Sequence, residues 1–237
     1  MLRSVKSLRG YQLRATDGEI GKVKDVYFDD HTWTARYLVI DTGGWLTGRQ
    51  VLISTNTLRG VDPASELLAV SLTRGQVENS PSIYEDQPVS RQHEAELADY
   101  YGYPYYWSAA YAGIPSAYPI ATVPPVPLEP TGLADGWSKS AREEGDPHLR
   151  SAEEVMGYRI QAEDGEIGHV EDFLLDDDSW RIQAMVVDTR DWLPGKKVLL
   201  SPESIEEVNW PGASVHVRLR RDEVEGQPGY NGSALVG

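Results

Sequence analysis

The chain contains no cysteine among its 237 residues, which excludes disulfide bonds, thiolate nucleophiles and thiolate metal sites. This composition is typical of a cytoplasmic protein, and residues 1–6 contain no apolar run, so we expect no secretory signal. The sequence also lacks a glycine-rich phosphate loop, a Ser/His/Asp order and a nucleophile elbow. We therefore expect no cofactor and no catalytic residues.

Positive charge is scarce. Lysine and arginine number 22 against 37 acidic residues, which gives a net charge of −15. The deficit is uneven, since residues 2–81 carry +1, residues 82–148 carry −7 and residues 149–228 carry −9. An acidic chain repels phosphate backbones, so general nucleic-acid binding is not expected.

One motif is present twice in the same register. Gly10-Tyr11 recurs as Gly157-Tyr158, and the Asp-Gly-Glu-Ile-Gly run at 17–21 recurs at 164–168, 147 positions later. Without a gap, 32 of the 80 positions aligned in this register are identical. Self-similarity of this kind indicates a duplicated domain.

The repeat divides the chain into a first domain at 1–81, a connector at 82–148, a second domain at 149–228 and a tail at 229–237. Each repeat contains short stretches rich in β-branched and aromatic residues, separated by Gly, Asp and Pro turns and preceded by a short helical turn. This pattern predicts an all-β protein of two small antiparallel barrels or sandwiches. Domains of this size are marginal alone, so we expect the two to pack together or the chain to form a homo-oligomer.

The repeated residues carry a family resemblance. Gly-Tyr, Asp-Gly-Glu-Ile-Gly, an acidic turn, the strand end Val39–Leu46 and a Val-Leu strand resemble the PRC-barrel domain. That family includes the cytoplasmic part of the photosynthetic reaction centre H subunit and the C-terminal domain of a ribosome maturation factor. The resemblance implies two small antiparallel PRC-type β-barrels joined by an aromatic, proline-rich connector.

The Asp-Gly-Glu-Ile-Gly motif could be an acidic metal site, but turn geometry explains it better. A glycine supplies the positive φ that a tight turn requires, and an aspartate bonds the turn. We assign this structural role to six residues: Asp17, Gly18, Gly21, Asp164, Gly165 and Gly168. The histidines lack a closed set of neighbouring ligands, so no metal site is expected.

Asp41-Thr42-Gly43 is similar to the active-site triplet of aspartic proteases, which pair two such carboxylates. The second copy reads Asp188-Thr189-Arg190 and lacks the glycine. We expect instead that Asp41 ends a strand and accepts hydrogen bonds from the following loop.

Large apolar side chains at loop positions are the candidate interaction residues. Trp45-Leu46 and Trp192-Leu193 each follow a strand end, where they could close the barrel or anchor a partner. In the connector, a short helix is expected near 90–101, followed by Tyr105, Tyr106 and Trp107. Residues 100–128 carry no charge but many prolines, which favours an ordered arm or an exposed adhesive patch over a membrane span.

The sequence therefore predicts a non-enzymatic binding or scaffold protein with an unidentified protein partner, a membrane surface being the alternative partner. The resemblance adds two further functions. One is a membrane-peripheral accessory of a photosynthetic or electron-transfer complex, and the other is a ribosome-assembly factor.

Overall fold

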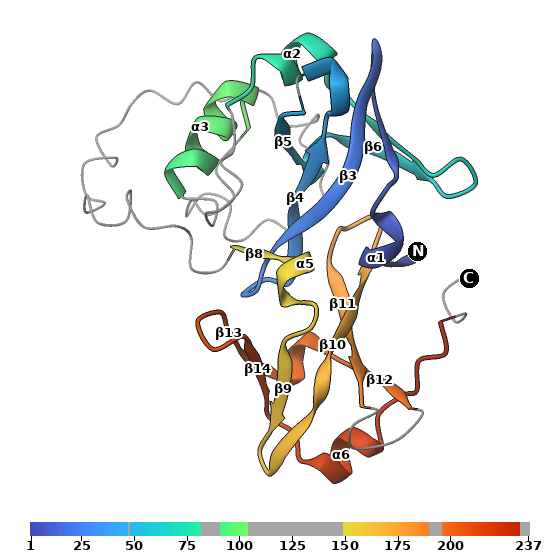
Figure 1. Ribbon diagram of the computed structural model, residues 1–237, viewed down its shortest axis with the longest axis vertical. Coiled ribbons are helices and arrows are strands. Elements are labelled where there is room, and N and C mark those ends of the chain that lie inside the picture. Colours follow the sequence, from blue (N-terminus) through green and yellow to red (C-terminus); the bar gives the residue numbers. More distant parts are fainter. Residues whose placement is uncertain (47, 82–90, 104–148, 190–195, 233–237) are drawn as a thin grey trace.

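The structure is a computed structural model, and it describes residues 1–46, 48–81, 91–103, 149–189 and 196–232. The candidate residues Tyr105, Tyr106, Trp107, Trp192 and Leu193 lie outside the described residues. The two repeats lie one above the other along the long axis of the molecule (Figure 1).

The first repeat consists of short strands with small helical turns between them. Its elements are β1 (Leu2–Ser4), α1 (Val5–Leu8), β2 (Gln12–Ala15), β3 (Gly18–Asp29), β4 (Thr34–Asp41), η1 (Gly43–Leu46), β5 (Gln50–Ser54), η2 (Thr55–Thr57), β6 (Leu58–Asp62), β7 (Leu67–Val70) and α2 (Arg74–Glu78). Helix α3 (Arg91–Tyr101) follows in the connector.

The second repeat has the same order of elements, apart from η1, whose equivalent positions lie outside the described residues. Its elements are β8 (Leu149–Ser151), α5 (Ala152–Val155), β9 (Arg159–Ala162), β10 (Gly165–Asp176), β11 (Ile182–Asp188), β12 (Lys197–Leu200), η5 (Pro202–Ser204), β13 (Ile205–Asn209), β14 (Ser214–Val217) and α6 (Arg221–Glu225). The predominance of strands confirms the expected all-β class.

The expectation of wholly antiparallel sheets is wrong at one ladder in each repeat. Strand β2 pairs with β7 in parallel, and β9 pairs with β14 in parallel. Parallel neighbours need a long connection, which here consists of all the strands from β3 to β6. Reading turns along the chain cannot reveal such a pairing.

The sheets are also not closed barrels. Across the described residues, the first sheet runs β5-β4-β3-β2-β7-β6, and no ladder joins its two ends. Between these two end strands, η2 turns the chain and its threonine hydroxyls bond to backbone carbonyls. The Thr55 hydroxyl donates to the Ala35 carbonyl over 2.9 Å, and the Thr57 hydroxyl donates to the Ser54 carbonyl over 2.7 Å.

The two repeats exchange their first strands. Strand β1 of the first repeat pairs with β10 of the second, and β8 of the second repeat pairs with β3 of the first. Figure 1 shows the consequence, with α1 lying beside β10 and α5 lying against β3. Each seven-stranded sheet therefore contains six strands of one repeat and the first strand of the other.

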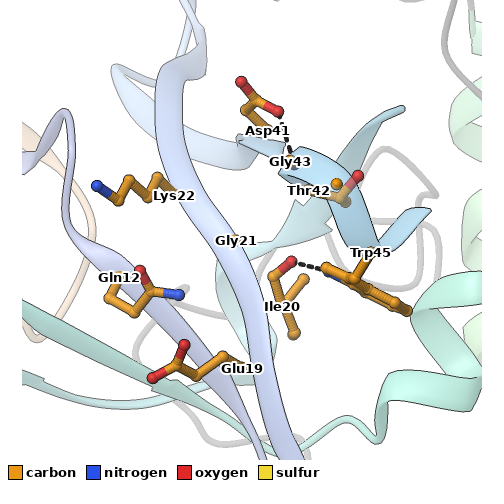
Figure 2. A pocket seen from close by; sticks show the side chains of 10 residues that line it. Gln12, Glu19, Ile20, Gly21, Lys22, Asp41, Thr42, Gly43 and Trp45 are labelled. Atoms are coloured by element: carbon orange, nitrogen blue, oxygen red, sulfur yellow. Dashed lines mark hydrogen bonds between the residues drawn. The ribbon is translucent and has the colours of Figure 1, made fainter. Parts of the chain in front are cut away.

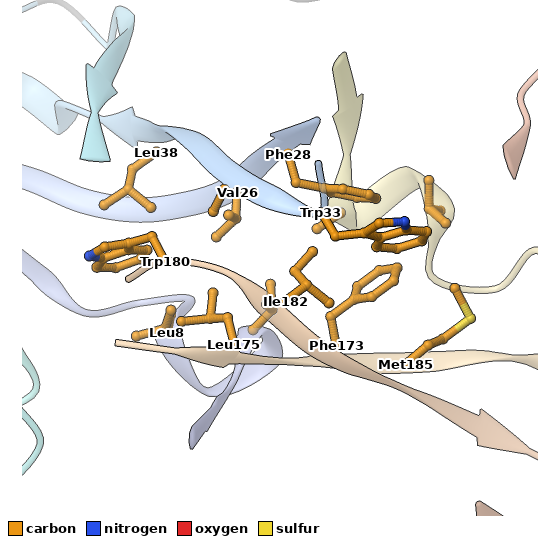
Figure 3. Packing of buried hydrophobic residues seen from close by; sticks show 14 of the residues in the cluster. Leu8, Val26, Phe28, Trp33, Leu38, Phe173, Leu175, Trp180, Ile182 and Met185 are labelled. Carbon is orange, nitrogen blue, oxygen red and sulfur yellow. The ribbon is translucent and has the colours of Figure 1, made fainter. Parts of the chain in front are cut away.

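The hydrophobic core is continuous between the repeats, and two tryptophans cross from one half to the other. Trp33 lies on Phe28, with ring centroids 5.6 Å apart, and reaches Phe173 of the second repeat at 6.5 Å. In Figure 3, Trp33 lies toward Phe173 and Met185, whereas Trp180 lies toward Leu38 of the first repeat. Burial of these aromatic rings stabilises the two halves together.

The same tryptophans join the repeats through their backbones. The amide of Ala35 donates to the Trp180 carbonyl over 2.8 Å, and the amide of Ile182 donates to the Trp33 carbonyl over 2.7 Å. Trp33 and Trp180 have φ values of 51° and 57°, in the left-handed region that non-glycine residues rarely adopt. These reciprocal hydrogen bonds, together with the reciprocal pairing of β1 and β8, show an approximate two-fold relation between the repeats.

Helix α3 covers the outer face of the first sheet. Its Leu97 packs in a cluster with Tyr37, Val39 and Leu52 of β4 and β5, to which β8 adds Leu149. Within the described part of the chain, no helix combines the length and the apolar character needed to cross a membrane.

Candidate functional site

A groove opens beside the loop that follows β4, and we call it the Trp45 groove. Its volume is about 310 Å³. Its lining residues are Gln12, Glu19, Ile20, Gly21, Lys22, Asp41, Thr42, Gly43, Gly44 and Trp45 (Figure 2). Glu19, Lys22 and Asp41 are exposed, so the groove presents charges of both signs around an aromatic wall.

A close contact between two backbone segments forms the floor of the groove. A Cβ atom built on Gly21 would lie 2.1 Å from the Asp41 carbonyl oxygen, so only glycine fits at this position of β3. Gly168 has the same relation to Asp188, at 2.0 Å, and a φ of +126°. The close approach places the end of β4 directly over β3.

Hydrogen bonds fix the loop above this floor. The Asp41 carboxylate accepts the Gly43 amide over 2.8 Å, which is the strand-end role that the sequence indicates. The buried Thr42 hydroxyl donates to the Arg49 carbonyl over 2.6 Å and closes the loop. These two bonds tie Gly43 to the end of β4 and join Thr42 to Arg49 across the loop.

Trp45 and Leu46 lie half-buried against the core. The Trp45 indole nitrogen donates to the Ile20 carbonyl, shown as a dashed line in Figure 2, and the Arg74 guanidinium carbon lies 4.4 Å from the Trp45 ring centroid. A cation over an aromatic face contributes attraction beyond area burial. The tryptophan thus both packs against the hydrophobic core and forms the wall of the groove.

The Asp-Gly turns connect to the helices that end each repeat. Gly18 and Gly165 have φ values of +153° and +140°. The Asp17 carboxylate accepts the first amide of α2, from Arg74, over 2.7 Å, and Asp164 accepts the equivalent amide of Arg221 over 2.9 Å. Each aspartate accepts a hydrogen bond from a helix N–H that has no partner within the helix. This N–H lies 57 residues later in the chain and does not belong to the aspartate's own turn.

Two buried carboxylates lie between the repeats, and the sequence analysis missed them. Asp25 accepts the Ser151 hydroxyl over 2.6 Å and the Glu153 amide over 3.0 Å. Its counterpart Asp172 accepts the Ser4 hydroxyl and, over 3.1 Å, the Lys6 amide. Each aspartate therefore binds the helical turn that the other repeat contributes. The available signal was that an aspartate is retained in both copies inside an apolar strand.

Burial raises the pKa of both carboxylates. Removal from water disfavours the charged form of Asp25, and the hydrogen bond from Ser151 opposes this only in part. The same balance, with Ser4 as the donor, raises the pKa of Asp172. Because the donors are the backbone and serines of the partner repeat, these groups join the two halves.

One cluster in the second repeat has the side chains of a metal site. Ligand atoms of His169, Glu171 and Asp188 lie within 4.8 Å of one another, where the first repeat has Lys22, Lys24 and Asp41. The Glu171 carboxylate lies 2.7 Å from the Lys6 ammonium and 3.3 Å from that of Lys197. Although burial opposes them, these lysines hold the pKa of Glu171 below its usual value. A cation there would have to compete with two ammonium groups.

Residues 2–75 match the model of the PRC-barrel domain. The PRC-barrel match covers the strands β1 to β7 and thus includes every residue that lines the Trp45 groove. No curated protein matches the chain. The second repeat lies outside this match and is similar to the matched region in sequence, as the internal repeat shows.

Proposed function

We propose that the chain is a non-enzymatic binding scaffold whose first repeat holds a polar segment of a protein partner in the Trp45 groove. The observation that supports this most is the groove itself, where three exposed charged side chains and a tryptophan line a floor of closely packed backbone. Preorganised loops bind with a smaller entropic cost than flexible ones. Tryptophan is also enriched among the residues that dominate protein interfaces.

The two repeats have diverged at this place, which supports a binding role for the first one. Lys22 and Gly43 of the groove correspond to His169 and Arg190. Asp41 is exposed, whereas Asp188 at the equivalent position is fully buried. The exchanged strands make the second repeat a fixed support for the first.

A pull-down with the full chain as bait tests the proposal. Lys22→Glu reverses the charge of the lysine that lines the groove, and a partner held there should be lost from the eluate. Arg14→Glu is the matched control, because Arg14 is exposed on the neighbouring strand β2 and does not line the groove. Equal recovery by both variants would remove the groove from consideration, and robust turnover by the pure protein would contradict the non-enzymatic role.

The identity of the captured protein separates this function from the two that the family resemblance implies. Recovery of ribosomal proteins would favour an assembly factor. Recovery of membrane-complex subunits, together with flotation on liposomes that is lost when residues 100–128 are deleted, would favour the membrane-peripheral accessory.

A further inference from the structure

Some contacts between the two repeats occur twice, once with each repeat supplying each partner, and we call these the central set. Arg3 Nε lies 2.6 Å from Asp177 Oδ2, and Arg150 Nε lies 2.7 Å from Asp30 Oδ2. These pairs use the same residue types at equivalent positions, as do the exchanged strands. This central set would form equally well between two identical repeats.

The rim of the interface is different, because equivalent positions carry opposite charges. Lys6 Nζ lies 2.7 Å from Glu171 Oε1, across the two halves. The positions equivalent to these two residues hold Glu153 and Lys24, so both signs are reversed between the copies. Arg9 Nη2 lies 2.5 Å from Glu153 Oε1, which gives a second rim pair between the repeats.

Pairing of identical repeats would place like charges together at this rim. Two first repeats in the same arrangement would set Lys6 against Lys24 and Arg9 against Lys6. Two second repeats would set Glu153 against Glu171, which would keep only Lys197 of its own repeat at 3.3 Å. They would together carry −18, against −8 for one repeat of each kind. Like charges in contact disfavour a complex and act on partner choice more than on affinity.

We propose that the repeats form a heterotypic pair, in which the interface accepts the other repeat and rejects a second copy of the same repeat through the rim charges at positions 6, 9, 153 and 171. The partner that this surface fits is the complementary repeat, from the same chain or from a second molecule. The inference is independent of the Trp45 groove and of what binds there.

The test uses the full protein with a protease site inserted between residues 130 and 131. The protein is cleaved after folding, unfolded in urea, refolded by dilution and weighed by native mass spectrometry. We expect nearly all pairs to contain one half of each kind. A mixture in which only half of the pairs are mixed, as random assortment gives, would overturn the proposal.

Charge variants assign the effect to the rim. Glu153→Lys with Glu171→Lys gives the second repeat the charges of the first, and should move the mixed fraction toward the random share. The control pair Glu163→Lys with Glu203→Lys changes the net charge equally at exposed positions elsewhere, and should leave pairing unchanged. An equal loss of selectivity in the control pair would contradict the rim assignment. High salt should weaken the selectivity, because it screens exposed charges.

If the cleaved halves do not refold, a measurement on the intact chain tests the rim attraction on which the proposal depends. Arg9→Glu and Glu153→Arg should each lower the unfolding midpoint, and the double variant should recover part of the loss. For an exposed ion pair we expect a coupling of about two- to five-fold in the unfolding equilibrium constant. Additive effects of the two changes would overturn the proposal.

Discussion

Ser151 donates a hydrogen bond of 2.6 Å to the buried carboxylate of Asp25, 126 positions earlier in the chain. The bond couples the helical turn of the second repeat to the longest strand of the first. Because Ser4 and Asp172 make the equivalent contact, the same device joins the repeats in both directions.

Asp25→Ala should destabilise the protein by about 2–4 kcal/mol, because the Ser151 hydroxyl and the Glu153 amide would lose their acceptor in a part-buried place. Asp25→Asn keeps an acceptor oxygen for the amide and a donor for the hydroxyl, so it should cost less than about 1 kcal/mol. Urea denaturation measures both values. The control Glu163→Ala, at an exposed side chain, should stay within about 0.5 kcal/mol of the parent. Equal costs for Ala and Asn would contradict this role.

The raised pKa values of Asp25 and Asp172 predict a contribution to stability that grows on acidification. A carboxyl group with a folded-state pKa above its model value of 3.8 binds its proton more tightly in the folded state. Its contribution therefore rises as the pH falls through the folded pKa, and is complete below 3.8. Asp176 and Glu171 have lowered pKa values and contribute in the opposite direction.

The double variant Asp25→Asn with Asp172→Asn isolates this contribution from the opposing ones. Urea denaturation from pH 7 to pH 4 should show the parent gaining stability relative to the variant as the pH falls. A difference that stays constant over this range would show that the two carboxyl groups do not titrate with folding.

Local chemistry made much of the secondary structure predictable. The tight turn at Gly18 and the acidic turn before Trp33 are set by residues within a few positions, and the strands on either side follow from them. Trp45 could likewise be singled out for the candidate site, since a large apolar side chain in a loop needs a packing or binding role.

Pairings between distant segments could not be predicted in this way. The alternation of apolar residues along a strand shows which side chains face a core. It does not show whether that core belongs to the same repeat or to the other one. Trp33 and strand β1 therefore looked like parts of their own repeat, although they pack and pair with the other one. Gln12 and Lys22 are paired across the β2–β3 ladder and line the groove with Trp45, a grouping that depends on the strand register.

Gly21→Ala should destabilise the protein by about 1–3 kcal/mol, because the added Cβ would lie 2.1 Å from the Asp41 carbonyl oxygen and force the two strands apart. Gly168→Ala should cost more, since its φ of +126° adds backbone strain to the contact with Asp188. Gly60→Ala is the matched control in a strand, with no atom within 4 Å of the added carbon. Thermal unfolding of the three variants gives the comparison, and a Gly21 variant as stable as the Gly60 variant would refute the close contact.

The exchanged strands and tryptophans predict that the two repeats unfold as one cooperative unit. Trp33 is 9% exposed and packs on Phe28 and Phe173, so Trp33→Ala removes contacts from both halves at once and should cost about 3–5 kcal/mol. Amide hydrogen exchange should show this loss equally in β3 and in β10. Trp210→Ala is the control for loss of an indole, because Trp210 is 43% exposed at a hairpin turn. Two separate unfolding transitions, or a loss of protection confined to the first repeat, would show instead that each repeat is stable by itself.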